Sequence, residues 1–516
     1  MMKTIGLYTT ILSLILVTSC MELDQFNPNA PTVESFWKTE ADLYTGLMGA
    51  YALLQDRYYG DGRINQVCLT MSDMGTVTRK SGELYNVARF IEEPWEFPWW
   101  NGSYKLISRA YQVIDRSVDI GDNENIRGMV GEAKFLVALA YYNLIQMYGY
   151  NIAYVDRELD AADDPAPRAD SLSITGLMES LLMEAIPVLP SASGYPLDQY
   201  GRATSGAAQA LLGKLYMQTH QYEFASEQFI DVIESGQYRL LENYADNFIN
   251  DGITANEEAI FLVNFTLNGP QGEDDENGIH RSYGIREMSG MGIFSDIAPT
   301  PFIFESFLKE RDVDGNFDPR MDITLFNDST SRLFYNLTYE EWRYFGVIDL
   351  LYDKNITTSF MKYSEQEGLE ISGDTVVTEK FKIGQTDFLV IRYADILLLQ
   401  AEALNEIHNG PDAADELGNT AYEYVDMVRE RSNMFPLSVA KPGLNSSEFL
   451  TQLQHERVVE LAEECVRYFD LRRWGLYNNN NRNDTDFETW TSEDLLVNIP
   501  LEEREVNPNL TSNPGY

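Results

Sequence analysis

Side chains with oxygen atoms alternate along one short segment in the second half of the chain. They are Asp312, Asp314, Asn316 and Asp318, at the spacing of the ligands in calcium-binding loops. An EF-hand also requires glycine at its sixth position and glutamate at its twelfth, where this chain has Phe317 and Ile323. The segment is therefore not an EF-hand. We expect a turn that leads into Asp318, with a looser calcium site as the alternative.

The residue patterns of hydrolases and nucleotide-dependent enzymes are missing. His455 and Glu456 begin a zincin-like pattern, but Val459 stands where the second histidine is required. There is no Gly-x-Ser-x-Gly elbow, phosphate loop or dinucleotide fingerprint. A glycosidase needs only two carboxylates about 5–9.5 Å apart, so the 81 acidic residues leave that alternative open. We predict a non-catalytic protein without a cofactor or a metal site.

Charged residues also recur along the stretch from Ser446 to Gly475. Those that share one helical face, three or four residues apart, are Arg457, Glu460, Glu464 and Arg467. Apolar residues form a neighbouring stripe: Leu450, Leu453, Val458, Leu461, Cys465 and Phe469. The pattern predicts one helix that ends at Gly475. We expect a solvated charged face; the alternative is a partly buried network that fixes how the helix docks. Neither interpretation is catalytic.

The composition is that of a large globular protein with a strongly acidic surface. The chain has 516 residues, of which 44% are hydrophobic, unlike chains that stay disordered. Acidic residues outnumber basic ones by 81 to 38, which gives a formal net charge of −43. This charge repels the phosphates of nucleic acids and acidic membrane surfaces, so we expect no nucleic-acid partner. It suits a neutral ligand, a cation-rich medium or simply high solubility.

The N-terminus has the pattern of a bacterial lipoprotein signal. Lys3 begins a short basic region, residues 11–17 are mostly apolar, and small residues lead into Cys20. The apolar run is too short for a stable membrane anchor, so we predict that residues 1–19 are removed and that Cys20 is lipidated. An ordinary secretory signal with an incidental cysteine is the alternative.

The chain has two further cysteines, Cys68 and Cys465. Three cysteines are too few and too scattered for a disulfide framework or a zinc site. No later segment offers 18 consecutive apolar residues, so we expect no further membrane span.

Helical periodicity dominates most of the chain. Apolar residues recur at helical spacing over 40–56, 104–118, 125–148, 174–189, 392–407 and 420–432. One segment also has the spacing of a tetratricopeptide repeat: Leu212, Gly213, Tyr216, Ala225 and Phe229. Its small residues let two antiparallel helices approach closely. Weaker helix pairs at 39–119, 125–189 and 390–433 predict a stack of about four units, since repeats need neighbours to bury their faces.

Two regions interrupt this helical pattern. A loop-rich stretch from Gly60 to Asn101 holds three of the seven tryptophans. Residues from about 240 to 386 are rich in Gly, Asp, Asn and aromatic residues, with short β-like runs at 259–265 and 375–381. We interpret the second region as a large insertion between repeats, and long insertions of this kind often carry function.

Several segments, taken in order, resemble the SusD/RagB family of outer-membrane nutrient-binding lipoproteins from Bacteroidetes. They are the cysteine at Cys20, Gly131 to Phe135, Arg392 to Asp395 with Gln400 to Asn405, Glu456 to Glu460 with Arg467 to Gly475, and the tail from Ile499 to Tyr516. Each signal is weak alone, but together they span nearly the whole mature chain. Glu22 and Asp24 after the cysteine also resemble the surface-export signal of such lipoproteins.

The resemblance implies a mostly α-helical scaffold of four tetratricopeptide-like units, with minor β structure and a loop-rich part that carries the ligand site. It implies a lipid-anchored position on the outer membrane at the cell surface and, as partner, a SusC-like TonB-dependent outer-membrane barrel transporter. The protein would bind an oligosaccharide or polysaccharide and close over the barrel as a hinged lid. A repeat scaffold that binds peptides or proteins is the alternative. The 467–475 motif would belong to the scaffold, with Tyr468 and Trp474 packed inside.

Sugar recognition requires flat apolar faces for pyranose rings and polar groups for hydroxyls. By resemblance, part of the binding face precedes the second scaffold helix, where the candidates are Trp95, Trp99, Trp100 and Asn101. Candidates in the insertion are Tyr283, Arg286, Trp342, Tyr344 and Phe345. Core packing or helix capping is the alternative for each, because many of the 63 aromatic residues must fill the core.

We therefore expect five parts in the chain. They are a signal peptide (1–19), a lipidated tether (20–38), an N-terminal helical repeat scaffold with the tryptophan-rich loop (39–239), a loop-rich ligand-binding insertion (240–388), and a C-terminal helical repeat with a closing tail (389–516).

Overall fold

Helices dominate the computed structural model, which describes residues 36–55, 59–60, 63–77, 98–159, 163–248, 255–265, 297–327, 359–363, 370–372, 375–377, 386–477 and 496–516. The longer helices are α3 (Glu40–Leu53), α4 (Arg63–Thr70), α6 (Pro98–Ile120), α7 (Glu124–Tyr148), α8 (Ser171–Ala185), α9 (Ser205–Gln218), α10 (Tyr222–Glu234), α12 (Pro301–Leu308), α15 (Tyr393–His408), α16 (Ala421–Arg431) and α18 (Ser446–Glu460). The short ones are α13 (Met321–Thr324), α17 (Leu437–Ala440), α19 (Arg467–Arg473), α20 (Leu501–Val506) and the 3-10 turns η2 (Ala192–Gly194), η3 (Leu197–Gln199) and η4 (Tyr244–Phe248). Within these ranges no helix has the length and hydropathy needed to cross a bilayer.

Small antiparallel sheets of two strands each accompany the helices. The pairs are β1 (Gly75–Val77) with β3 (Ile297–Pro299), β2 (Ala259–Val263) with β8 (Phe388–Arg392), β4 (Leu325–Phe326) with β5 (Ser359–Phe360), and β6 (Glu370–Ser372) with β7 (Thr375–Val377). The strand expected at 259–265 is confirmed as β2, and β7 covers the first part of the run expected at 375–381. Because β8 leads directly into α15, the β2–β8 pair joins the region after residue 240 to the C-terminal helices.

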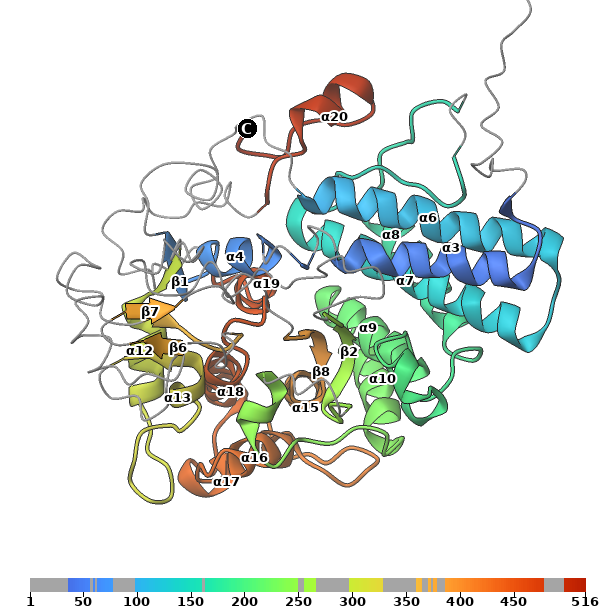
Figure 1. Ribbon diagram of the computed structural model, residues 1–516. Coiled ribbons are helices and arrows are strands. Elements are labelled where there is room, and N and C mark those ends of the chain that lie inside the picture. Colours follow the sequence, from blue (N-terminus) through green and yellow to red (C-terminus); the bar gives the residue numbers. More distant parts are fainter. Residues whose placement is uncertain are drawn as a thin grey trace, which may run out of the picture.

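The long helices pack as four consecutive pairs. The pairs are α3 with α6, α7 with α8, α9 with α10, and α15 with α16. Each pair also contacts the next, through α6 and α7, α8 and α9, and α10 and α15, so the pairs follow one another from the blue helices to the orange ones (Figure 1). This arrangement confirms the mostly α-helical fold with tetratricopeptide-like repeats.

The third pair shows why the repeat signature contains a glycine. A Cβ atom added to Gly213 of α9 would lie 2.4 Å from the ring of Phe229 on α10, which is closer than real Cβ atoms approach. Phe229 and Ala225 are fully buried in this contact. Only glycine at this position therefore allows α9 and α10 to pack so closely around the phenylalanine ring.

The stretch from Ser446 to Gly475 is two helices, contrary to the expected single one. α18 ends at Glu460 and α19 begins at Arg467. In the turn between them, Glu463 and Cys465 have φ values of 64° and 61°, a backbone region that such residues rarely adopt. The apolar spacing did continue through this turn, so the break comes from contacts with other parts of the chain.

Lys362 supplies several of the contacts that hold this turn. Its Nζ atom donates hydrogen bonds to the main-chain oxygens of Glu460 (3.1 Å) and Ala462 (2.8 Å) and to Oε1 of Glu464 (2.5 Å). The three donors of the buried ammonium group are therefore used. Burial lowers the pKa of Lys362 to about 8, although Glu464 opposes this shift.

A disulfide bond between Cys68 of α4 and Cys465 also holds the turn. The two Cα atoms lie 5.1 Å apart, and 397 positions separate the cysteines in the sequence. Three cysteines, too few and too scattered for a disulfide framework, did not predict this single bond from the sequence. Their spacing along the chain carried no signal, because the fold alone brings α4 to the α18–α19 turn.

The charged face of α18 is buried, so the expectation of a solvated face is wrong and the alternative of an ionic network is right. Glu460, which has no exposed surface, lies at the centre of what we call the Glu460 cluster. Arg320 and Arg392 donate to its carboxylate over 2.9 and 2.7 Å, and Arg431 donates to it as well. The acidic members are Glu258, Glu310, Asp318, Glu456, Glu460 and Glu464, and the basic members are Arg320, Lys362, Arg392, Arg429, Arg431 and Lys441. Equal numbers of opposite charges keep the buried cluster neutral.

A second group of ion pairs fixes α19. Arg457 pairs with Asp470 (2.8 Å) and with Asp395 of α15 (2.9 Å). Arg473 pairs with Asp470 (2.9 Å) and with Glu402 of α15. Tyr468 is fully buried, as expected for a helix that closes the scaffold, whereas Trp474, which was also expected inside, is only half-buried. In the C-terminal tail, Asn513 donates to the main-chain oxygen of Tyr148 at the end of α7 over 2.9 Å.

Candidate functional site

Trp99 and Trp100, which the sequence indicated as candidate ligand-binding residues, lie in a helix and not in a loop. α6 begins at Pro98, so Trp99, Trp100 and Asn101 form its first turn. Trp99 is 4% exposed and Trp100 2% exposed, while Asn101 is half-buried. The centroid of the Trp100 ring is 5.0 Å from that of Tyr104 and 5.1 Å from that of Tyr148. The two indoles therefore pack in the core, the alternative stated for them above, and present no face to a ligand at the surface.

The other predicted binding residues lie outside the described residues. They are Trp95, Tyr283, Arg286, Trp342, Tyr344 and Phe345, and the lipidation residue Cys20 is also outside. Their role in binding and anchoring remains a prediction from the sequence.

The alternating oxygen side chains at 312–318 form a turn. Oδ1 of Asp312 accepts hydrogen bonds from the main-chain nitrogens of Asp314 (3.0 Å) and Asn316 (2.7 Å). Asp318 forms an ion pair with Arg320 (2.7 Å) and so belongs to the Glu460 cluster. The expected turn is confirmed. Across the described ranges, His, Cys, Asp and Glu residues form no group that could hold a metal ion.

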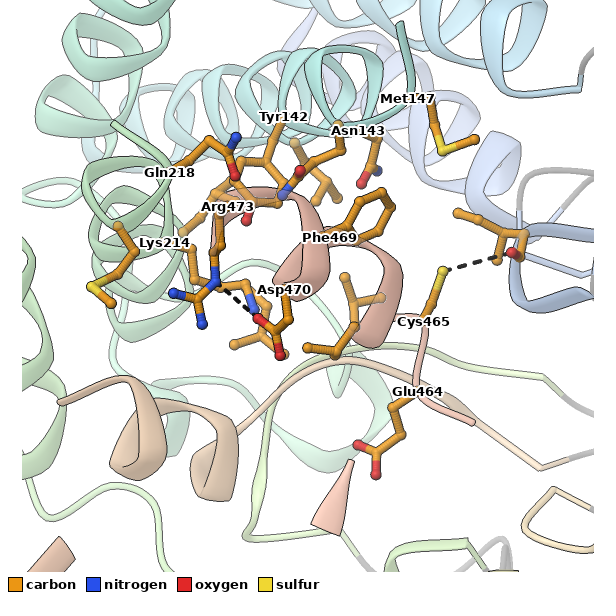
Figure 2. Close-up of a pocket in the computed structure, with 18 of the residues that line it drawn as sticks. Tyr142, Asn143, Met147, Lys214, Gln218, Glu464, Cys465, Phe469, Asp470 and Arg473 are labelled. Atoms are coloured by element: carbon orange, nitrogen blue, oxygen red, sulfur yellow. Dashed lines mark hydrogen bonds and ion pairs between the residues drawn. The ribbon is translucent and has the colours of Figure 1, made fainter. Parts of the chain in front are cut away.

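A cavity lies between α7, α9 and α19 (Figure 2). Figure 2 shows Tyr142 and Asn143 of α7, Lys214 and Gln218 of α9, and Phe469, Asp470 and Arg473 of α19 around it. Trp99 of α6 also lines the cavity. The buried Nε1 of Trp99 and Oε1 of Gln218 have no hydrogen-bond partner among the described residues. Oε1 of Gln146, another lining residue, has no such partner either, so the walls offer a donor and more than one acceptor to a small polar guest.

The charged side chains of this cavity are neutralised by each other. Lys214 pairs with Asp395, and Asp470 lies 2.9 Å from Arg473 and 2.8 Å from Arg457. Burial alone would lower the pKa of Lys214, but the Asp395 carboxylate outweighs it and raises that pKa. For Asp470, burial acts to raise the pKa, and Arg457 and Arg473 reverse this and lower it. The carboxylate therefore stays ionised and paired, which does not suit a general acid or base at neutral pH.

Size decides what the cavity can hold. Its volume is about 80 Å³, whereas pockets for small-molecule ligands have about 300–1,000 Å³. A water molecule occupies about 30 Å³, so the cavity suits a few waters and not a sugar ring. The sequence patterns did not indicate this cavity, because Lys214 and Gln218 lie on an otherwise apolar helix and meet α19 only in the folded chain. We regard the cavity as part of the scaffold.

The similarity of the chain to known proteins identifies its family. The sequence profile described as "SusD family" matches residues 257–516, which is half of the chain. The chain belongs to the SusD family. A second profile, described as "Starch-binding associating with outer membrane", matches residues 23–217. Together the two matches cover the scaffold on both sides of the region at about 240, so the family resemblance stated from the sequence is confirmed.

Relatives and solved structures of SusD-like proteins extend over almost the whole chain. SusD-like protein P2 of Formosa agariphila is 26% identical over 542 residues, covering 98% of this chain and 99% of its own. A SusD-like carbohydrate-binding protein from Bacteroides fragilis superposes with a TM-score of 0.76 at 20% identity, covering 92% of this chain and all of its own. A laminarin-binding SusD-like protein superposes with a TM-score of 0.72 at 24% identity, covering 93% of this chain and all of its own. At these identities the structural likeness establishes the fold.

Proposed function

We propose that this SusD-family protein is a non-catalytic, cell-surface lipoprotein that binds an oligosaccharide and delivers it to a TonB-dependent outer-membrane transporter. The observation that carries the proposal is the family match over the scaffold, whose N-terminal profile is described as starch-binding. The likeness to structures titled as carbohydrate-binding and laminarin-binding proteins supports a glycan as ligand. The high negative charge of the chain favours a neutral glycan over an acidic one.

The proposed binding face consists of the candidate residues from the sequence, without the two buried indoles. They are Trp95, Tyr283, Trp342 and Tyr344, with Arg286 as a polar partner and Asn101 at the start of α6. Flat aromatic faces cover the CH side of a sugar ring, and polar groups satisfy hydroxyls whose burial would otherwise be costly. Trp99 and Trp100 would act indirectly, by fixing the start of α6.

Affinity gel electrophoresis with a panel of neutral polysaccharides tests this proposal. We expect at least one glycan to retard the soluble protein, and Trp95→Ala with Trp342→Ala to weaken that retardation at least about tenfold. Phe224→Ala removes an aromatic ring that is 52% exposed on α10 and serves as the matched control, with unchanged retardation. Binding of peptides with no retardation by any glycan would support the alternative of a peptide-binding scaffold. Reducing sugar released from a retarding glycan would instead reveal an enzyme.

Lipidation of Cys20 is the proposed anchor. The disulfide between Cys68 and Cys465 supports a location outside the cytoplasm, because such bonds persist in oxidising compartments. We expect Cys20→Ala to release the protein from the outer-membrane fraction, and Ser13→Ala within the signal to leave it there. Equal membrane retention of the two variants on fractionation would argue against the anchor.

The proposed partner is a SusC-like barrel transporter, over which the protein would act as a hinged lid. Co-purification from solubilised outer membranes tests this partner directly. We expect the tagged lipoprotein to co-purify with a TonB-dependent barrel at equal stoichiometry. Recovery of the lipoprotein without a barrel would argue against its role as a lid.

A further inference from the structure

A larger crevice lies on the scaffold, away from the cavity beside α19. It has a volume of about 330 Å³, within the range of small-molecule pockets. Three chain segments form it: the α8–α9 connection with η2 and η3, the residues Gln237 and Tyr238 that follow α10, and the residues from Ala255 through most of β2. None of these residues belongs to the binding face assigned above.

Three tyrosines line the crevice, and the protein itself binds each of their hydroxyl groups. Tyr195 donates to the main-chain oxygen of Ala203 (3.2 Å), and Tyr200 donates to that of Asn256 (3.1 Å). The hydroxyl of Tyr238 lies 2.8 Å from Oγ1 of Thr204. These bonds hold the rings in place, so the aromatic walls are ready before any ligand arrives and little side-chain entropy is lost on binding.

The backbone of the crevice is also fixed. Gly201 has a φ of +94°, and a Cβ atom there would lie 2.4 Å from the side-chain nitrogen of Asn264. That nitrogen donates to the main-chain oxygen of Tyr200 over 2.5 Å. A close approach that only glycine permits therefore keeps the tyrosine on the wall of the crevice.

Polar groups with free capacity complete the lining. Oε1 of Gln237 accepts from the main-chain nitrogen of Ser193 (3.1 Å), and its amide nitrogen has no partner among the described residues. Glu257 is half-exposed, and among the described residues its side chain pairs with the exposed Arg239, a pairing that contributes little. The positive charge of Arg202 is compensated within the protein, because its guanidinium group donates to both carboxylate oxygens of the buried Glu132. The free groups are thus one donor and one acceptor, which suits hydroxyls, and the carboxylate disfavours anions.

We propose that this crevice binds one or two sugar residues of a neutral glycan, as a second carbohydrate site separate from the proposed binding face. The fixed rings of Tyr195 and Tyr200, which are half-buried, supply apolar surface for the CH side of a pyranose, and the buried Tyr238 supports the wall behind them. Gln237 and Glu257 supply the hydrogen bonds that its hydroxyls need, and the volume limits the ligand to a mono- or disaccharide unit. The choice of a neutral glycan as ligand rests on the proposed function, whereas the residues of the crevice are separate from the proposed binding face.

Saturation-transfer NMR with neutral disaccharides (maltose, cellobiose, laminaribiose and mannobiose) tests the crevice in a Trp95→Ala, Trp342→Ala background, where the proposed binding face lacks both of its tryptophans. We expect at least one disaccharide to bind. Tyr195→Ala should weaken its binding at least about tenfold, whereas Tyr195→Phe, which keeps the ring, should change it little. Ser193→Trp, a substitution at an exposed position that fills the crevice, should abolish binding while thermal unfolding stays unchanged.

The outcomes separate the two sites. Absence of binding by all four disaccharides in the background variant, or binding that survives Ser193→Trp, would overturn the crevice proposal. Binding by the crevice with no polysaccharide retardation by the native protein would overturn the proposed binding face and leave the crevice in place.

Discussion

Replacing Glu460 by glutamine is expected to lower the free energy of unfolding by about 3–5 kcal/mol. The substitution removes the negative charge that three buried arginines share. It also places the NH₂ group of the glutamine side chain, a hydrogen-bond donor, against the N–H donors of these arginines. Arg320, Arg392 and Arg431 would then lack part of their compensation in a site without solvent. Folded proteins are stable by only about 5–15 kcal/mol, so this single change removes a large share.

Urea unfolding followed by circular dichroism measures this effect. The matched control is Asp122→Asn, which removes a carboxylate that is 80% exposed and pairs with Arg127 at the surface. Such a pair contributes less than about 1 kcal/mol, so the control should stay close to the native protein. A similar loss of unfolding free energy in Glu460→Gln and Asp122→Asn would contradict the prediction that the buried Glu460 cluster contributes more to stability than an exposed ion pair.

The acid side of the stability curve supplies a second readout of the same cluster. Burial acts to raise the pKa of Glu460, but Arg431, Arg392 and Arg320 reverse this and hold it well below its usual range. In Glu310, burial is likewise outweighed by Arg429 and Lys441, and the pKa falls to about 2. A carboxyl whose pKa is lowered on folding stabilises the protein above its unfolded pKa and loses that contribution as the pH falls toward the folded pKa. Stability should therefore fall between about pH 4.5 and 2, less steeply in Glu460→Gln.

Loss of the disulfide is the second change with a large expected effect. The double variant Cys68→Ser, Cys465→Ser should lose about 2–4 kcal/mol of stability, because the bond restricts an unfolded chain over 397 positions. The native turn must also keep Glu463 and Cys465 at positive φ, which the bond helps to enforce. Equilibrium unfolding in urea, compared with that of the native protein, measures the loss.

Reduction provides the matched control for this prediction. Dithiothreitol should shift the unfolding midpoint of the native protein toward that of the double variant and leave the variant itself unchanged. If reductant destabilises both proteins equally, or neither, the stabilising role of the bond is refuted.

Several residues of the motifs that carry the family resemblance are members of the buried ionic networks. Arg392 and Glu460 lie in the Glu460 cluster, and Asp395, Arg457 and Asp470 tie α15 to α18 and α19. These residues connect helices that are far apart in sequence, and no part of them forms a ligand pocket of sugar size. The most specific residues of the sequence therefore report on the scaffold, whereas the proposed ligand contacts lie in segments without such a pattern.

The sequence by itself determined the paired helices of the repeats. Periodicity placed α7 and α15 to within a residue or two, and the spacing of Gly213 and Phe229 predicted the close packing of α9 on α10. Such features depend on neighbouring turns or on one short connection, so their information is local in the chain.

Only the tertiary structure decided which polar and aromatic side chains are buried. Spacing showed that Arg457 and Glu460 share a face of α18, but not that Arg320 and Arg392 from other segments would cover that face. The helix break after Glu460 follows from the same cause, because Lys362 and the disulfide act across the fold to bend the chain where the apolar spacing continues. Trp99 and Trp100 were likewise buried by contacts from α7 and its neighbours. These outcomes depend on partners that are distant in sequence, which no local pattern encodes.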